Sequence, residues 1–183
     1  MIINVRGTSG SGKSTLVRRV LYTLGERIPI FRDGRKQPLL YECPKHNTVV
    51  LGHYEGERGG GCDTISGFDN TYDLVKYYSD LGWHVLFEGL LLSAEVNRLI
   101  EVSKKHKTII IKLTTPFEEC ARSVKQRRLD RGNTKPVGPN FKKNLMSKHK
   151  GTDKTCERFQ DAGGEVLGAS REGAYEIITA LLP

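Results

Sequence analysis

The chain has few cysteines and no long apolar run. Cys43, Cys62, Cys120 and Cys156 are scattered without a C-x₂-C pair, so their spacing indicates neither a zinc site nor a redox motif. Scattered thiols are more typical of a reducing cytosol than of a disulfide framework. The apolar stretches are strand-length, far short of the ~20 residues that span a bilayer. We therefore expect a cytoplasmic enzyme without a membrane segment. We also expect no targeting peptide, because a glycine-rich loop begins at residue 7.

Acidic residues are scarce in one region. The chain carries a net charge of +8, but residues 122–154 hold eleven Lys and Arg against two Asp and Glu, a local balance of +9. The rest of the chain is therefore close to neutral. Such a basic segment is often only a solvated face. It is also typical of a lid over nucleotide phosphates or of a track for a nucleic-acid backbone.

The first fifteen residues carry the strongest motif. Residues 1–6 are typical of a short buried strand, and residues 7–15 follow the pattern G-x-x-x-x-G-K-[ST]. A helix is predicted from Lys13 to the stop at Gly25, with apolar residues at i, i+3 and i+4. A flexible Gly/Ser linker would not be flanked by such a strand and helix. The predicted nucleotide-binding residues are Gly7, Thr8, Ser9, Gly10, Ser11, Gly12, Lys13, Ser14 and Thr15.

Each part of this loop has a physical reason. Its glycines let backbone N–H groups surround phosphates, and the helix dipole favours an anion at the same place. Lys13 would reach the β- and γ-phosphates, and the hydroxyl of Ser14 would coordinate Mg²⁺. The motif therefore predicts a protein that binds a nucleoside triphosphate.

The remaining pattern alternates strands with helices. Strands are predicted at 38–42, 48–54, 83–87, 108–113 and 165–167, the first two as a hairpin or edge insertion, and helices at 69–81, 94–105, 117–131 and 171–182. The helix over 69–81 places Leu74, Tyr77, Tyr78 and Leu81 on one side. Residues 132–164 are read only as a polar segment. We expect one α/β domain over 1–183, with a parallel sheet, helices on both faces and ligands at the carboxyl ends of the strands.

Two carboxylates lie where that rule places function. Glu88 ends the predicted strand 83–87 and is suited to hold Mg²⁺ directly or through water, although a loop or N-cap acid would look the same. Asp63 follows three glycines at 59–61 and is the first choice for the catalytic base, with turn chemistry beside Thr64 as the alternative. Asp33 competes for the same role, although a plain turn explains it well.

Cations and aromatic residues complete the candidate site. The inner line of helix 117–131 continues onto Arg127, Arg128 and Arg131, which would clamp phosphates from a closing lid. His53, Tyr54 and Arg58 are candidates for an acceptor pocket, although a half-buried strand end explains His53 and Tyr54 nearly as well.

The order of these parts resembles the small P-loop kinases of the nucleoside and nucleotide kinase kind. The resemblance covers most of the chain and is carried by residues 7–15, by the acidic strand end 85–89, and by the lid-like stretch 115–132. It implies a P-loop NTPase fold, a nucleoside triphosphate as donor, Mg²⁺ and a mobile arginine lid.

A narrower resemblance concerns residues 4–15 and 52–64. These two stretches are similar to bacteriophage kinases that phosphorylate 5-hydroxymethyluracil already incorporated in DNA, a step toward hypermodified thymidine. That likeness implies DNA as a partner, which would explain the basic segment 122–154. It also implies base flipping, because a hydroxyl on a stacked base is poorly placed for in-line attack.

The leading hypothesis is an ATP-dependent kinase of hydroxymethyl groups on DNA bases, in the host cytoplasm if the gene belongs to a phage. One alternative is a kinase of a free nucleoside, nucleotide or other small metabolite. Another is a DNA-binding NTPase or nucleotide switch. The absence of a guanine-recognition signature from the sequence argues against this alternative. A lid of arginines favours transfer, because excluding water separates a kinase from a hydrolase.

Overall fold

The described part of the protein is built on a seven-stranded sheet. The structure is a computed structural model that describes residues 1–32, 34–56, 60–65, 67–89 and 91–183. The strand order is β2-β3-β4-β5-β1-β6-β7. The strands are β1 (Ile2–Arg6), β2 (Ile28–Ile30), β3 (Leu40–Cys43), β4 (Thr48–Leu51), β5 (His84–Glu88), β6 (Thr108–Leu113) and β7 (Glu165–Ala169). Strands β4, β5, β1, β6 and β7 pair in parallel, whereas β2 and β3 form an antiparallel edge beside β4.

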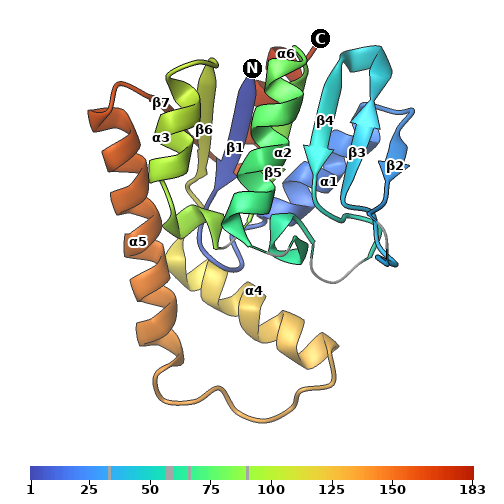
Figure 1. Ribbon diagram of the computed structural model, residues 1–183. Helices are drawn as coiled ribbons and strands as arrows, with labels where there is room; N and C mark the ends of the chain where they lie inside the picture. The colour runs from blue at the N-terminus through green and yellow to red at the C-terminus, as the bar shows by residue number, and fades with distance from the viewer. Residues whose placement is uncertain (33, 57–59, 66, 90) are drawn as a thin grey trace.

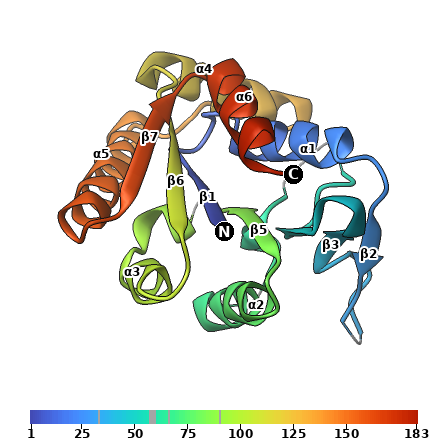
Figure 2. The same ribbon diagram turned by 90° about the horizontal axis from the view of Figure 1, so that it is seen from above.

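Helices cover both faces of this sheet (Figure 2). One face packs against α1 (Lys13–Thr23) and α6 (Arg171–Leu181), and the other against α2 (Phe68–Asp80), α3 (Asn97–Ser103) and the end of α5 (Phe141–Asp161). Short 3₁₀ turns are η1 (Pro44–His46), η2 (Cys62–Thr64) and η3 (Leu92–Ala94). The central strands are buried on both sides, as their continuous apolar runs predict. The predicted α/β class with a mostly parallel sheet is confirmed.

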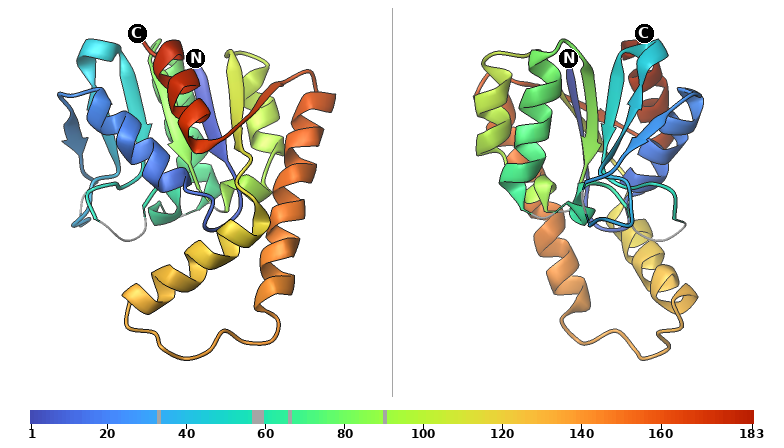
Figure 3. Two further views of the ribbon diagram at one scale, coloured as in Figure 1. Left: turned by 180° about the vertical axis from the view of Figure 1, so that it is seen from behind. Right: turned by 45° about the vertical axis from the view of Figure 1, so that its right-hand side comes forward.

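The basic segment forms an arm below the carboxyl ends of the parallel strands. Helix α4 (Phe117–Asp130) crosses beneath them, and a loop returns the chain to α5 (Figures 1 and 3). The first half of α5 extends past the sheet, and the second half packs against it through Cys156 and Phe159. An ion pair of 2.6 Å between Lys112 and Asp153 joins β6 to the same helix. The arm is therefore anchored at both ends on the sheet.

Two elements depart from the sequence prediction. Helix α5 occupies 21 residues that were read only as polar, because the helix buries Thr152, Thr155 and Cys156 where apolar residues would have revealed its period. Strand β2 adds an edge strand beside the predicted hairpin; it is short and carries Pro29, which weakens its strand signal.

Helix α2 turns a different face to the core from the side that its apolar residues suggested. Tyr72, Val75 and Tyr78 are buried, whereas Tyr77 and Leu81 are 59 % and 57 % exposed. Small polar residues, Thr71 and Ser79, fill the rest of the buried face, which obscured its position in the sequence. All four cysteines are free and buried. In the ranges that the structure describes, no helix combines the length and apolar character needed to cross a bilayer.

Candidate active site

The glycine-rich loop lies between β1 and α1, at the carboxyl end of the sheet. Gly10 and Gly12 have φ angles of 84° and 96°, which favour glycine. A Cβ at Gly10 would overlap the carbonyl oxygen of Cys120 on α4, and one at Gly12 would lie 2.6 Å from Cδ of Arg171 on α6. The loop therefore needs glycine at both positions so that α4 and α6 can approach it. No described side chain caps the start of α1.

Lys13 is held inside this loop. Its Nζ donates hydrogen bonds to the carbonyl oxygens of Gly7 and Thr8, at 2.8 and 3.2 Å. Burial lowers the pKa of the Lys13 ammonium, while the charges of Glu88 and Asp63 act in the opposite direction. A buried ammonium held by backbone carbonyls is positioned to bind an anion at the loop.

Glu88 faces the same loop from the end of β5, which pairs with β1 in register Val5 to Glu88. Its Oε1 accepts a hydrogen bond of 2.7 Å from the hydroxyl of Ser14. The side chain is 1 % exposed, and burial raises the pKa of the Glu88 carboxyl against the opposing effect of Lys13 and Ser14. Gly61 packs directly on this carboxylate, where a Cβ would overlap Oε1. One of the glycines before Asp63 therefore makes room for Glu88.

Asp63 lies on η2, two residues after the glycine that packs on Glu88. The backbone N–H of Leu91 donates to its Oδ1 at 3.2 Å. Arg35 holds the same turn in place, because its guanidinium donates to the carbonyl oxygen of Thr64 at 2.7 Å. Asp63 is exposed, with its carboxylate bonded by Leu91 and the carbonyl of the next residue bonded by Arg35.

These groups share one cleft. The cleft has a volume of about 360 Å³ and is lined by Ser9, Gly10, Gly12, Lys13, Ser14, Thr15, Asp63, Glu88, Ser123, Arg127, Arg131 and Arg171. Of the predicted arginines, Arg127 and Arg131 line it together with Ser123; the three are spaced four residues apart, Ser123 and Arg127 on one face of α4 and Arg131 directly after its last residue. Arg128 lies on the adjoining face and is not among the lining residues. Gly7, Thr8 and Ser11 do not line the cleft; the carbonyl oxygens of Gly7 and Thr8 accept hydrogen bonds from Lys13, and the N–H of Ser11 donates to Thr8.

The electrostatics of the cleft favour an anion. Burial and the neighbouring charge of Arg131 both lower the pKa of Arg127. Arg127 in turn helps to lower the pKa of Lys13. Cations that disfavour one another in the protein are stabilised by a shared negative ligand. The arrangement can therefore bind a polyphosphate between the loop and α4.

Two cleft residues were not predicted. Ser123 precedes Arg127 by one helical turn, and that spacing is the signal that could have identified it. Arg171 is the first residue of α6, and its guanidinium donates to Glu119 of α4 at 2.6 Å. The helix is capped by Ser170, whose hydroxyl accepts a hydrogen bond from the N–H of Gly173. Nothing local in the sequence brings α6 to the loop. A second cavity, of about 380 Å³, shares Thr15 and Arg171 with the cleft.

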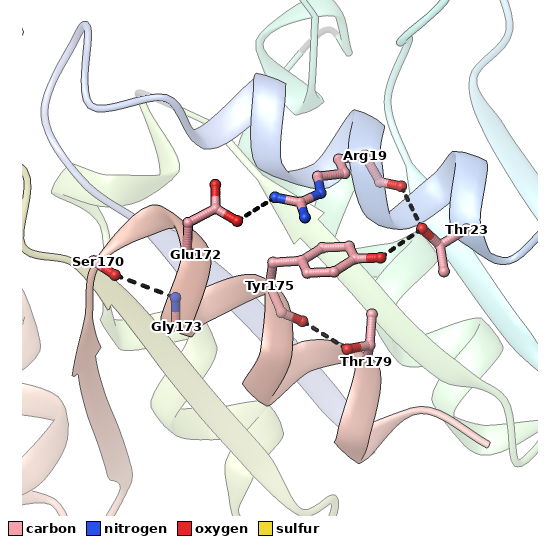
Figure 4. A network of polar contacts seen from close by, with 7 residues as sticks. All are labelled: Arg19, Thr23, Ser170, Glu172, Gly173, Tyr175 and Thr179. Carbon is pink, nitrogen blue, oxygen red and sulfur yellow. Dashed lines mark hydrogen bonds and ion pairs between the residues drawn. The ribbon is translucent and has the colours of Figure 1, made fainter.

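The second cavity is bounded by contacts between α1 and α6. Arg19 donates to Glu172 at 2.5 Å, and the hydroxyls of Thr23 and Tyr175 lie 2.9 Å apart (Figure 4). The guanidinium of Arg19 also lies 3.8 Å from the centre of the Tyr175 ring. These contacts fix α6, and with it Arg171, against the helix that begins at Lys13.

The predicted acceptor residues do not meet in the cleft. Tyr54 is 1 % exposed and packs on Tyr41 at 6.4 Å between ring centroids, so it is a core residue, which corrects its assignment to an acceptor pocket. His53 is half-buried, and its carbonyl oxygen accepts from the N–H of Gly61. Arg58 and the competing base Asp33 lie outside the described residues.

Comparison with known proteins identifies the family. The family model described as 5-hmdU DNA kinase matches residues 1–158. A 5-hmdU DNA kinase of Pseudomonas phage PaMx11 is 44 % identical over 186 aligned positions, covering 99 % of this chain and 96 % of the relative. The chain belongs to the 5-hmdU DNA kinase family.

More distant members of the 5-hmdU DNA kinase family differ in size. The kinase of Delftia phage PhiW-14 is 28 % identical over 88 % of this chain and 65 % of its own length. That of Bacillus phage SP10 is 25 % identical over 89 % of this chain but only 26 % of its own length. Because the chain belongs to a kinase family, the cleft described above is part of a phosphotransferase.

Proposed function

We propose that this enzyme transfers the γ-phosphoryl group of ATP to the hydroxymethyl group of 5-hydroxymethyluracil in phage DNA, in the host cytoplasm. The observation that carries the proposal is the cleft in which Lys13 and the Ser14–Glu88 pair face Asp63. Its support from outside the structure is membership of a family named for this substrate.

Residues 7–15 act as a P-loop for the donor. Backbone N–H groups at the start of α1 bind phosphate oxygens, and Lys13 faces the β- and γ-phosphates. Arg127 and Arg131 offset the charge of the transferred group from α4, which acts as the lid. The second cavity continues from Thr15 and Arg171, and we assign the nucleoside of ATP to it.

Ser14 and Glu88 fit a divalent cation. A hydroxyl and a buried carboxylate oxygen 2.7 Å apart are the hard oxygen donors that Mg²⁺ prefers, used together with phosphate oxygens. Mg²⁺ held there would neutralise charge on the β- and γ-phosphates. Glu88 is then oriented by the Ser14 hydroxyl and protected from bulk water by Gly61.

Asp63 is the base in this proposal. The acceptor oxygen attacks the γ-phosphorus, the bond from that phosphorus to the bridging oxygen of ADP breaks, and the proton of the acceptor hydroxyl passes to the Asp63 carboxylate. The N–H of Leu91, bonded to Oδ1, orients the carboxylate. The target base leaves the helical stack to reach this point, while basic side chains of 122–154 bind the DNA backbone.

One assay tests the whole proposal. The enzyme is offered γ-labelled ATP with DNA containing 5-hydroxymethyluracil, with plain DNA, and with free nucleosides and nucleotides. Digestion of the product then locates the label. We expect label on the modified base of DNA. Label on a free nucleoside or nucleotide alone would indicate a small-molecule kinase, and release of phosphate without an acceptor would indicate an NTPase.

A further inference from the structure

A groove lies between α2 and the segment that follows β2, next to the residue after η2. It has a volume of about 420 Å³, and its lining includes Phe31, Arg32, Ile65, Asp73, Leu74 and Tyr77. Nothing in the proposed transfer of the phosphoryl group uses this groove. Its walls come from the residues directly after β2, directly before β3 and directly after η2, and from α2.

The groove and the active-site cleft each share a lining residue with a third cavity. A smaller cavity, of about 70 Å³, is lined by both Asp63 and Ile65. Asp63 also lines the cleft, and Ile65 also lines the groove. The residue that would face the acceptor hydroxyl and the groove are therefore neighbours, two residues apart in the sequence at Asp63 and Ile65.

Two aromatic side chains stand exposed in this groove. Tyr77 is 59 % exposed and Phe31 is 52 % exposed. The Tyr77 ring is held edge-on by Tyr78 at 5.2 Å, and the hydroxyl of Tyr78 donates to Glu42 at 2.6 Å. Tyr77 is thus positioned by a buried neighbour rather than free to fold onto the surface. Exposed, oriented rings are the platforms on which nucleobases stack in single-stranded DNA complexes.

The charges of the groove suit one nucleotide. Arg32 can contact a phosphate, and Lys36 is an exposed cation on the same segment. Asp73 on the opposite wall disfavours a phosphate but can accept a hydrogen bond from a base. The phosphate therefore belongs beside Arg32, and the base belongs at the two rings, within reach of Asp73.

We propose that this groove binds the nucleotide next to the acceptor on the same DNA strand, with its base stacked on Tyr77 and Phe31. The inference rests on the proposed function, because it takes the acceptor to be at Asp63. It gives the enzyme a physical means to prefer an acceptor within a strand over the same nucleotide in free form. The flipped acceptor loses its stacking partners, and the groove replaces the stack of its neighbour.

The test compares two acceptors in each protein variant. One is the free 5-hydroxymethyl-2′-deoxyuridine monophosphate, and the other is a trinucleotide with that residue at its centre. Stacking on an aromatic side chain contributes from a few-fold to about 100-fold in affinity. We expect Tyr77→Ala to lower the ratio of kcat/KM for the trinucleotide over the monomer about 10-fold, and Phe31→Ala to lower it less.

Tyr22→Ala is the matched control. Tyr22 is 54 % exposed on α1, with Arg27 over its ring and no part in any of these cavities. We expect its ratio to equal that of the wild type. A direct readout uses 2-aminopurine as the neighbouring base: its fluorescence changes on binding to the wild type and to Tyr22→Ala, and the change is reduced in Tyr77→Ala.

Three outcomes would overturn the inference. The first is that the wild type phosphorylates the trinucleotide and Tyr77→Ala has the same ratio of kcat/KM for the trinucleotide over the monomer. The 2-aminopurine signal could be the same in all variants. Sedimentation could show that the wild type is a dimer and Tyr77→Ala a monomer, which would make the groove an interface between copies. A wild type that phosphorylates no modified DNA is a different result, because it rejects the proposed function itself.

Discussion

The two sides of the cleft are built differently. On the proposed donor side, Lys13 and Ser14 belong to one continuous motif; the bonds from Lys13 to Gly7 and Thr8 are buried, and the bond from Ser14 to Glu88 is partly buried. On the proposed acceptor side, Asp63 is exposed, and its support comes from Leu91 and Arg35, which are distant in the sequence. Recognition of phosphate uses local backbone, so it leaves a compact motif. Recognition of an acceptor uses side chains assembled by the fold, so its signal is spread along the chain.

The largest effect is expected from Lys13→Ala on the donor side. In the proposed site Lys13 faces the transferred phosphoryl group, so we expect kcat to fall by about 10³–10⁵, the range for a cation that stabilises this charge. The fold should survive, because the variant removes a buried charge whose pKa is already lowered by burial. Turnover and circular dichroism measure the two effects. Lys45→Ala, at a lysine that is 71 % exposed and paired with Glu26, is the control and should retain activity. A folded Lys13→Ala enzyme with near-normal turnover would refute the donor site.

Asp63→Asn tests the acceptor side alone. General-base assistance is worth about 10²–10⁴ in rate, so kcat should fall within that range while ATP still binds. Asp80→Asn is the matched control, because Asp80 lies at the far end of α2 and bonds His106 at 2.9 Å. Single-turnover rates and ATP binding are measured on both. If Asp63→Asn is active and Asp33→Asn is not, Asp33 is the base.

Glu88→Gln tests the cation site between the two sides. The amide keeps the shape of Glu88 but weakens its oxygen as a Mg²⁺ ligand. We expect the Mg²⁺ concentration for half-maximal activity to rise about 10-fold or more, with a smaller change in the KM for DNA. A magnesium titration of activity gives both values. An unchanged magnesium dependence would place the cation elsewhere.

The arginines of α4 sharpen the comparison by helical face. Arg127 and Arg131 line the cleft and Arg128 does not. We expect Arg127→Ala and Arg131→Ala each to lower kcat about 10- to 100-fold with every acceptor, through lost stabilisation of transferred charge. Arg128→Ala should retain at least about half of the activity. Equal losses in all three would mean that α4 rotates when it closes.

The sequence predicted what short-range physics determines. The glycine loop, the parallel strands and α4 follow from a compact motif, continuous apolar runs and clear helical period. Glu88 and Asp63 were identified because parallel strands end at the same edge of a sheet. Their meeting in one cleft was therefore readable before the structure.

The errors come from long-range packing and from polar residues in the core. Arg171 reaches the cleft because α6 packs on α1, which no local pattern states. Helix α5 and the buried face of α2 use threonine and serine inside, which hides their period. Tyr54 continues the strand pattern in the sequence, but β4 ends at Leu51. The side chain of Tyr54 is then buried in the core.

The smallest effect on turnover, and the one that decides whether the arm contacts DNA, is expected from the lysines of α5. Lys142, Lys143, Lys148 and Lys150 are exposed on the half of the helix that extends past the sheet. If they track a DNA backbone, affinity falls with salt at a slope of about −0.9 for each duplex phosphate neutralised, or about −0.7 on a single strand. Changing all four to glutamine should flatten that slope and raise the KM for DNA a few-fold, with ATP binding barely changed.

The control for that experiment uses the opposite end of the molecule. Lys45, Lys104, Lys105 and Lys107 are exposed at the amino ends of parallel strands, away from the cleft. A variant with these four changed to glutamine has the same net charge as the α5 variant, so any general effect of charge on DNA binding is equal in the two proteins. Binding of a modified oligonucleotide is measured across a salt series. A flatter slope in the α5 variant alone places DNA on the arm. Equal slopes would leave the arm as a solvated face or a lid over the nucleotide, and the acceptor side would then hold its substrate without a backbone track.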